Sequence, residues 1–387
     1  MAANTSAFDW VGETLKPNET LYYLDGPAIF TQKIGPYIFL FVKADEREAS
    51  DYFIASHINE KILRYLRNGQ ISVRGALLSG SLLVFELDLD LKVLGYQEVT
   101  DDEVSAYLPK LGIGIKSEFG LVPDSVQQSE AAYAFKFFGD ELTEKGMPLS
   151  TFKNVIDDVY KTLKTILTPS SLGQGKTRGV IDFPMRPLEF ASLVVAIDGP
   201  QIDEGRLKRG KNTKGLDAAT MLAESDELGI GFANDLKRTV DVVASGTVPN
   251  KFAEDNFDFL LAIVDILPSQ KSEIKRLQFS ANNVNGGNIF VDVDLLTAEK
   301  IRASVSAIDD SIIETHGFIS GVLAKSSTLR IQTRFKREVT CKLQREVFDD
   351  LLASDKLSIG RPIIVLGNYT KRPLRDYMSV EGYPTFP

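Results

Sequence analysis

TLRIQTRFKREVTCKLQ, residues 328–344, contains two short runs rich in β-branched and aromatic residues that are typical of strands. Three similar runs and one short helical pattern surround it: THGFISGVLA (315–324), EVFDDLLAS (346–354), RPIIVLGNYT (361–370) and DYMSVEG (376–382). Short strands at regular spacing, joined by glycine-containing turns, are typical of small barrels. Residues 311–387 are therefore predicted to form a small β-barrel of the OB or SH3 kind.

Two further regions precede the barrel. Residues 21–125 contain the aromatic strand patterns LYYLDGPAIF and YIFLFVKA, followed by the helical pattern INEKILRYLRNG, which predicts a small mixed α/β domain after an irregular leader over 1–20. Residues 130–310 are predicted to form a central α+β domain. Its helices include PLSTFKNVIDDVYKTLKTIL, with Ser150 as the expected cap, and TAEKIRASVSAI, with Thr297 as the expected cap. The predicted fold class is α+β and multi-domain.

Composition limits the class of protein. The chain has 387 residues, 43% of them apolar and 25% charged, which fits two to four globular domains. No apolar run reaches the ~20 residues that span a bilayer, and the N-terminus has no secretory pattern, so we expect a cytoplasmic protein without membrane contact. The net charge is −9, but residues 312–387 hold 12 Lys+Arg and 8 Asp+Glu. A basic C-terminal region in an acidic chain indicates a nucleic-acid or acidic-partner surface, or simple variation.

The stretch SSLGQGKT (170–177) resembles the end of a phosphate-binding loop. A P-loop needs a glycine where this chain has Ser170, and it leads from a strand into a helix. Here the stretch follows a predicted helix and enters a predicted strand, so no helix N-terminus is available to hold phosphates. We expect a turn. Contact of Lys176 and Arg178 with an anion is the weaker alternative.

Catalytic constellations are not visible in the sequence. Of the two histidines, His57 is expected at a helix start and His316 near a turn, and the single Cys341 is expected as a small buried residue within a strand. Nucleophile-elbow and dinucleotide motifs are absent. Three pairs of carboxylates could in principle hold Mg²⁺, although surface roles at strand edges explain them as well: Asp88 and Asp90, Asp157 and Asp158, and Asp292 and Asp294. No catalytic residue, metal site or cofactor is predicted.

Basic and aromatic residues of the barrel are the clearest functional feature. Arg330, Arg334 and Lys336 share even parity, and they project from one face if residues 328–344 form one continuous strand. The last hairpin adds Lys371, Arg372, Arg375 and Tyr377, and a cationic loop near 203–215 could extend the surface. A cationic barrel face with aromatics is suited to single-stranded nucleic acid. The alternative is a solvated face balanced by acids such as Glu338.

The N-terminal region resembles an uncharacterised bacterial family, a domain of unknown function. The resemblance is carried by a Tyr-x-Asp-Gly-Pro opening, a second aromatic strand and a Gly-x-Ile-Ser-Φ-Arg signature, and it covers about the first 100 residues. Its positions here are Tyr23, Asp25, Gly26, Pro27, Phe30, Gly69, Ile71, Ser72 and Arg74. It implies a genomic setting beside mobile-element and defence genes and implies no activity. Physically, Asp25-Gly26-Pro27 is expected to be a turn, and Arg74 is expected to pair with an acid.

These patterns lead to one hypothesis with an alternative. The hypothesis is a non-enzymatic binding protein, a sensor, adaptor or inhibitor subunit of bacterial antiviral defence. The acidic N-terminal domain would contact a protein partner, and the barrel would contact nucleic acid or a further protein. Self-association is left open. The alternative is a metal-dependent nuclease or phosphodiesterase that uses Asp292 and Asp294.

Overall fold

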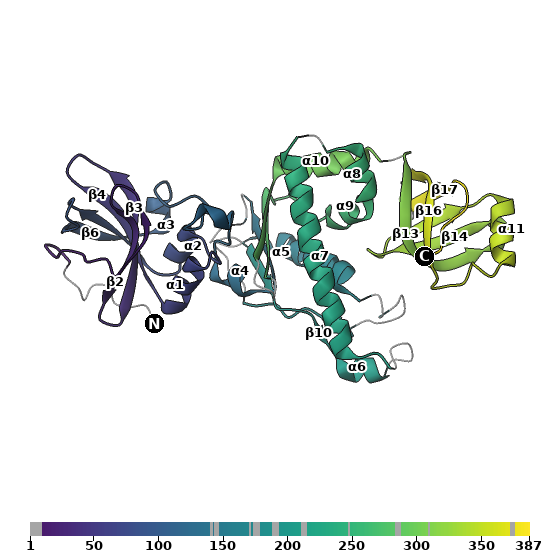
Figure 1. Ribbon diagram of the computed structural model, residues 1–387, viewed down its shortest axis with the longest axis horizontal. Helices are drawn as coiled ribbons and strands as arrows, with labels where there is room; N and C mark the ends of the chain where they lie inside the picture. The colour runs from purple at the N-terminus through teal and green to yellow at the C-terminus, as the bar shows by residue number, and fades with distance from the viewer. Residues whose placement is uncertain are drawn as a thin grey trace. The chain divides into compact units, whose positions relative to one another are not determined.

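A computed structural model describes residues 10–139, 142, 147–169, 172, 179–187, 193–209, 215–246, 248–282, 288–308, 310–371 and 376–387. The chain forms two compact units. The first comprises Met1–Ala134 and Ser280–Phe290, and the second comprises Phe135–Phe279 and Val291–Pro387. Both units mix helices with sheets (Figure 1). The α+β multi-domain fold class is confirmed.

The first unit contains a six-stranded antiparallel meander, in which each strand pairs with the next one along the chain. Its strands are β1 (Glu19–Tyr23), β2 (Pro27–Ile34), β3 (Tyr37–Glu46), β4 (Asp51–Ile58), β5 (Leu82–Leu87) and β6 (Val93–Val99). Its helices are α1 (Glu60–Arg67), α2 (Val73–Leu77), α3 (Asp101–Val104), η2 (Ser117–Phe119) and α4 (Val126–Glu130). Strands β1 and β6 are the edges of this sheet.

Both faces of this sheet are apolar, because side chains of opposite parity pack on separate cores. One face carries aliphatic residues such as Leu40 and Ile54, which pack on α1 and α2. The other face carries phenylalanines, against which Trp10 and Leu15 are buried. The Trp10 ring contacts Phe39 edge-to-face at a centroid distance of 5.2 Å. The predicted leader therefore supplies part of the core through its residues from Trp10 onward.

The stretch from β7 to α10 contains a further sheet and several helices, most of whose residues belong to the second unit. A four-stranded sheet has the order β12-β11-β7-β9, and β8 pairs with β10. The strands are β7 (Tyr133–Phe138), β8 (Ile181–Asp182), β9 (Leu193–Ile197), β10 (Gln201–Ile202), β11 (Arg276–Asn282) and β12 (Asn288–Asp294). The helices are α5 (Leu149–Leu167), α6 (Glu204–Arg209), α7 (Ala218–Ala244), α8 (Asn250–Asp255), α9 (Phe257–Ile263) and α10 (Leu295–Ser306).

Two expected helix caps are wrong by a few residues. Helix α5 is preceded by Pro148 as its cap, and Ser150 already lies inside the helix. Helix α10 begins at Leu295 because the carboxylate of Asp294 accepts a hydrogen bond from the backbone N–H of Thr297 at 2.7 Å. Aspartate and threonine both favour capping positions. The local pattern therefore allowed two starts, and the chain uses the earlier one.

The C-terminal part is a closed five-stranded barrel of order β13-β14-β15-β17-β16. Its elements are β13 (Ile312–Leu323), η4 (Ala324–Ser326), β14 (Thr328–Thr333), β15 (Glu338–Lys342), α11 (Arg345–Ala353), β16 (Pro362–Thr370) and β17 (Asp376–Val380). The long β13 shifts register between Ile319 and Gly321 and pairs with both β14 and β16, while β15 and β17 are parallel. This order, with a helix between the third and fourth strands, is that of an OB fold.

Candidate binding groove and barrel face

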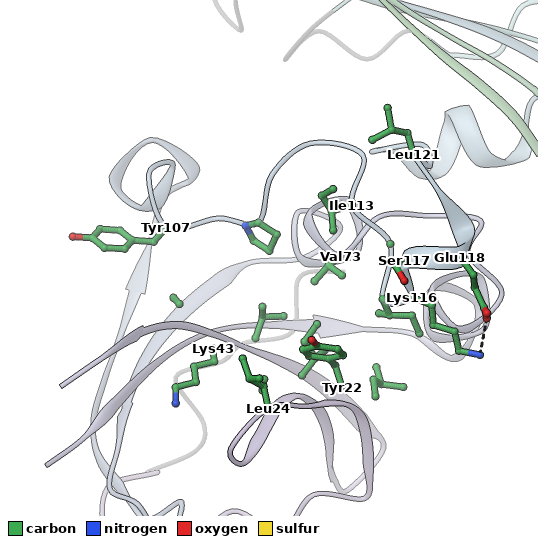
Figure 2. A pocket seen from close by; sticks show the side chains of 18 of the residues that line it. Tyr22, Leu24, Lys43, Val73, Tyr107, Ile113, Lys116, Ser117, Glu118 and Leu121 are labelled. Atoms are coloured by element: carbon green, nitrogen blue, oxygen red, sulfur yellow. Dashed lines mark ion pairs between the residues drawn. The ribbon is translucent and has the colours of Figure 1, made fainter. Parts of the chain in front are cut away.

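A groove of about 1320 Å³ lies in the first unit, between the sheet and the chain segment 107–121 (Figure 2). Its sheet wall contains one cross-strand row, because Tyr22 is paired with Ile29 and Ile29 with Val42. Paired residues of neighbouring strands point to the same face. The loop wall is formed by Val73 of α2 and by residues of 107–121, with Ile113 opposite the sheet wall.

The opening motif of the N-terminal resemblance builds the sheet wall. Asp25 has a φ of 49° and Gly26 a φ of 147°, so the chain turns sharply between β1 and β2. Glycine tolerates this conformation, whereas most residues with a Cβ do not. The expected turn is therefore present. It places Leu24 and Ala28, on its two sides, in the lining of the groove.

The second motif of the resemblance fixes the loop wall. The Ser72 hydroxyl donates to Asp124 Oδ1 at 2.5 Å and accepts from the Gly75 N–H at 2.8 Å. The same carboxylate oxygen accepts from the Gly112 N–H at 2.8 Å, so it ties the loop to the start of α2. Arg74 donates to the Pro109 carbonyl at 3.4 Å, not to an acid as expected. Both motifs thus border the same groove.

The groove exposes apolar side chains and carries a small excess of negative charge. Five large apolar side chains of its lining are 45–58% exposed: Tyr22, Leu24, Tyr107, Ile113 and Leu121. Its charged residues are two lysines and three acids: Lys43, Asp45, Glu46, Lys116 and Glu118. Both lysines are already in ion pairs, because Lys43 contacts Glu46 at 2.6 Å and Lys116 contacts Glu118 at 3.5 Å. The exposed apolar patch is typical of an interaction site.

A smaller pocket of about 240 Å³, lined in part by Tyr107, adjoins the groove. The two pockets share Ala44, Asp45 and Tyr107 in their linings. The cross-strand row also continues, from Val42 to Ile54, Val84 and Gln97. All three of those residues line the smaller pocket. The groove therefore has a side pocket large enough for one or two side chains.

The outer face of the barrel brings together part of the predicted basic surface. Arg330 of β14 is paired with Thr340 of β15, and Thr340 with Tyr377 of β17, so these three side chains lie in one row. Lys342 lies two residues beyond Thr340 on the same face. Glu338 also lies on this face, with an oxygen 3.7 Å from Arg330 Nε. The face is thus mixed in charge, with an aromatic ring beside the cations.

Arg334 and Lys336 do not share this face. The condition for it, one continuous strand over 328–344, is not met, because β14 ends at Thr333 and β15 starts at Glu338. In the turn between them, Lys336 has a φ of 59° and its Nζ donates to the Lys164 carbonyl of α5 at 3.3 Å. Burial, together with nearby Lys164, lowers the pKa of Lys336. The turn packs on the central helices, with Phe335 edge-to-face on Phe259 at 6.0 Å.

The remaining predicted contacts are only partly described. Lys371 is exposed and directly follows β16. Arg372, Arg375, Lys176 and Arg178 lie outside the described residues, and so does most of SSLGQGKT. Sequence reasoning overlooked Lys342 and also Gln332, which lies two residues after Arg330 on the same face of β14 and is paired with Glu338. It also overlooked the apolar groove residues Leu24, Ile113 and Leu121.

Four of the six candidate carboxylates have structural roles: Asp88, Asp158, Asp292 and Asp294. Asp292 accepts from Arg276 Nε at 2.7 Å, and Asp294 caps α10. Asp88 lies after β5, not within a strand, and its side chain accepts from the backbone N–H groups of Asp90 and Lys92. In α5, Asp158 pairs with Lys161. Among the residues that the structure describes, no three His, Cys, Asp or Glu side chains lie together as metal ligands would.

The histidines and the cysteine differ little from ordinary structural residues. His57 lies in β4, not at a helix start, and its ring contacts Tyr37 edge-to-face at 5.2 Å. His316 lies in β13, and its Nε2 is 2.6 Å from Glu314 Oε1. Cys341 is buried in β15 as expected, and burial raises the pKa of its thiol to about 12. A thiol with so high a pKa is a poor nucleophile at neutral pH.

Comparison of the chain with protein-family models, curated proteins and solved structures finds no match. The resemblance of the N-terminal motifs therefore stays a prediction. Among the described helices, none combines the length and the apolar character needed to cross a bilayer.

Proposed function

We propose that this protein is a non-enzymatic binding protein that holds a protein partner in the groove of its first unit. The observation that carries the proposal is the groove itself, where five large apolar side chains are 45–58% exposed. Its volume of about 1320 Å³ exceeds the ~300–1,000 Å³ typical of small-molecule sites, which favours a macromolecular segment as the ligand. A role as sensor, adaptor or inhibitor subunit in bacterial defence is proposed from the N-terminal resemblance.

A groove variant tests this function in the full-length chain. Leu24→Glu places a charge in the groove, and Leu89→Glu places the same charge on a side chain that is 73% exposed outside it. Each tagged protein is incubated with nuclease-treated lysate of the native host, and the captured proteins are quantified by mass spectrometry. We expect wild type and Leu89→Glu to capture the same amount of one partner. Leu24→Glu should capture about tenfold less of it, because its carboxylate replaces an apolar contact and would be buried in the interface. Equal capture by the two variants would refute the proposal.

A second binding function is proposed for the barrel, namely contact with single-stranded nucleic acid. It is supported by the row of Arg330, Thr340 and Tyr377 on β14, β15 and β17, with Lys342 beside it. OB folds use the surface of their second and third strands for such ligands. Cations on this surface would neutralise phosphates, while the Tyr377 ring would stack on a base.

A further inference from the structure

We infer that the segment bound in the groove is an amphipathic α-helix with basic residues beside its apolar stripe. This inference rests on the proposed function and names the class of partner. The geometry that carries it is the cross-strand row of Tyr22, Ile29 and Val42, which runs across three strands. At ~4.8 Å between strands, this floor is about 10 Å long, or about two helical turns.

Backbone hydrogen bonding distinguishes a helix from an extended peptide. Of the three strands beneath the row, only β1 is an edge, whereas β2 and β3 each have paired neighbours on both sides and offer no free backbone groups to a ligand that lies across them. An extended peptide in that position would bury its own N–H and C=O groups against aliphatic side chains, which is costly. A helix satisfies these groups internally and needs only an apolar stripe.

The layer architecture of the unit points to the same occupant. An apolar sheet face is normally covered by helices. On this face, α1 and α2 cover residues such as Ile58 and Leu82, whereas the groove leaves Ile29 of β2 and Leu21 of β1 only half-buried. A partner helix in the groove would complete the helical layer. One long apolar side chain of that helix could enter the side pocket that Tyr107 lines.

Charge complementarity indicates basic residues on the partner. Partial burial opposes the charge on Lys43, but hydrogen bonds to Glu46 and Asp51 outweigh it and raise the pKa of this lysine. Its positive charge is thus already balanced by two carboxylates, at 2.6 and 2.9 Å. Asp45 adds a further carboxylate to the lining. Residues 1–124 contain 11 Lys+Arg and 18 Asp+Glu, so the surroundings are acidic as well.

Three fluorescent peptides of about 15 residues test the inference against the full-length protein by fluorescence anisotropy. The first has leucines at helical spacing flanked by lysines, the second has glutamates in place of the lysines, and the third has the composition of the first in strand-like alternation. Each peptide is titrated with wild type, Leu24→Glu and Leu89→Glu. Both variants add one negative charge, so non-specific attraction of a basic peptide changes equally.

The helical basic peptide is expected to bind wild type and Leu89→Glu alike and to bind Leu24→Glu about tenfold more weakly. If the alternating peptide is the one that binds with this sensitivity to Leu24→Glu, the groove function stands and the helix inference is wrong. Stronger binding of the acidic helix would overturn the charge argument. If no peptide distinguishes Leu24→Glu from Leu89→Glu, the helix inference is wrong, and the capture experiment alone decides the groove function.

Discussion

At the scale of single residues, Asp294 joins a strand to a helix through one carboxylate. It ends β12, and its Oδ1 accepts from the N–H of Thr297 at 2.7 Å. Hydrogen bonds from the side chain and then the backbone of Thr297 lower its pKa from the ordinary value of 3.8. Folding therefore favours the charged form of Asp294. Its contribution to the free energy of unfolding is fully present above the ordinary pKa of the unfolded chain, and it is lost as pH falls through the lowered pKa of the folded protein.

Asp294→Ala is expected to reduce the free energy of unfolding by ~1 kcal/mol at pH 7, as loss of a helix cap usually does. Asp294→Asn keeps an acceptor oxygen and should lose less. Urea denaturation at several pH values checks both. The deficit of the alanine variant should persist down to about pH 4 and shrink below it, because wild type then loses the charge as well. A deficit that is independent of pH would show that the carboxylate charge does not matter.

Single residues also show where sequence reasoning ends. The alternation of side chains along β12 correctly placed Asp292 and Asp294 on the same face of the strand. It could not identify Arg276 as the partner of Asp292, because Arg276 is 16 positions away. Asp124 holds Ser72 across 52 positions and Gly112 across 12. Pairing of this kind depends on tertiary structure, and a local pattern carries no information about it. The loop wall of the groove could therefore not be predicted.

At the scale of elements, the turn between β14 and β15 anchors the barrel to the central helices. Arg337, with a side chain only 13% exposed, forms ion pairs with Asp258 of α9 and with Asp376 of β17, the latter at 2.8 Å. Its guanidinium also lies 5.0 Å from the Phe257 ring centroid. Burial raises the pKa of Asp258, although Arg337 opposes this rise. The carboxylate thus depends on Arg337 to stay charged.

Arg337→Met is expected to lower the free energy of unfolding by ~3–5 kcal/mol, because it leaves buried carboxylates without a cation. Arg345→Met is the matched control, since it removes an exposed i,i+4 pair with Asp349 and should cost under ~1 kcal/mol. Urea denaturation at pH 7 measures both. Without Arg337 the pKa of Asp258 rises further. The Arg337→Met protein is then more stable when Asp258 is protonated, and it loses this stability as pH rises through the raised pKa. The deficit should therefore shrink as pH falls. Equal losses in the two variants would contradict the anchoring role.

The same turn explains why the strands were predicted better than their connection. The barrel strands and α11 follow from alternation and spacing, and the structure confirms them. The reversal at residues 334–337 uses Lys336 at a φ of 59°, a conformation usually given to glycine or asparagine. With none of the usual turn residues in RFKR, the sequence contains no signal for the reversal. Arg334 and Lys336 were accordingly assigned to the face of Arg330.

At the scale of the whole molecule, charge is divided unevenly along the chain. Residues 1–124 have 18 acids against 11 Lys+Arg, whereas residues 312–387 have 8 acids against 12 Lys+Arg. Composition alone showed this division, but only the barrel topology shows which cations share a surface. An acidic first unit should repel nucleic acid, so any contact with it should depend on the barrel.

Binding of a fluorescent oligothymidine by the full-length chain, measured by anisotropy across a range of salt concentrations, tests this division of roles. For single strands, the logarithm of affinity falls with log salt by about 0.7 per phosphate contact. Arg330→Glu combined with Lys342→Glu should weaken binding by about tenfold or more and reduce the slope by about 1.4, if each cation holds one phosphate. Arg345→Glu with Lys356→Glu changes the net charge equally, on α11 and just after it. If this control weakens binding as much as the first pair does, the attraction belongs to the net charge of the barrel, and the face of β14 and β15 is not a binding site.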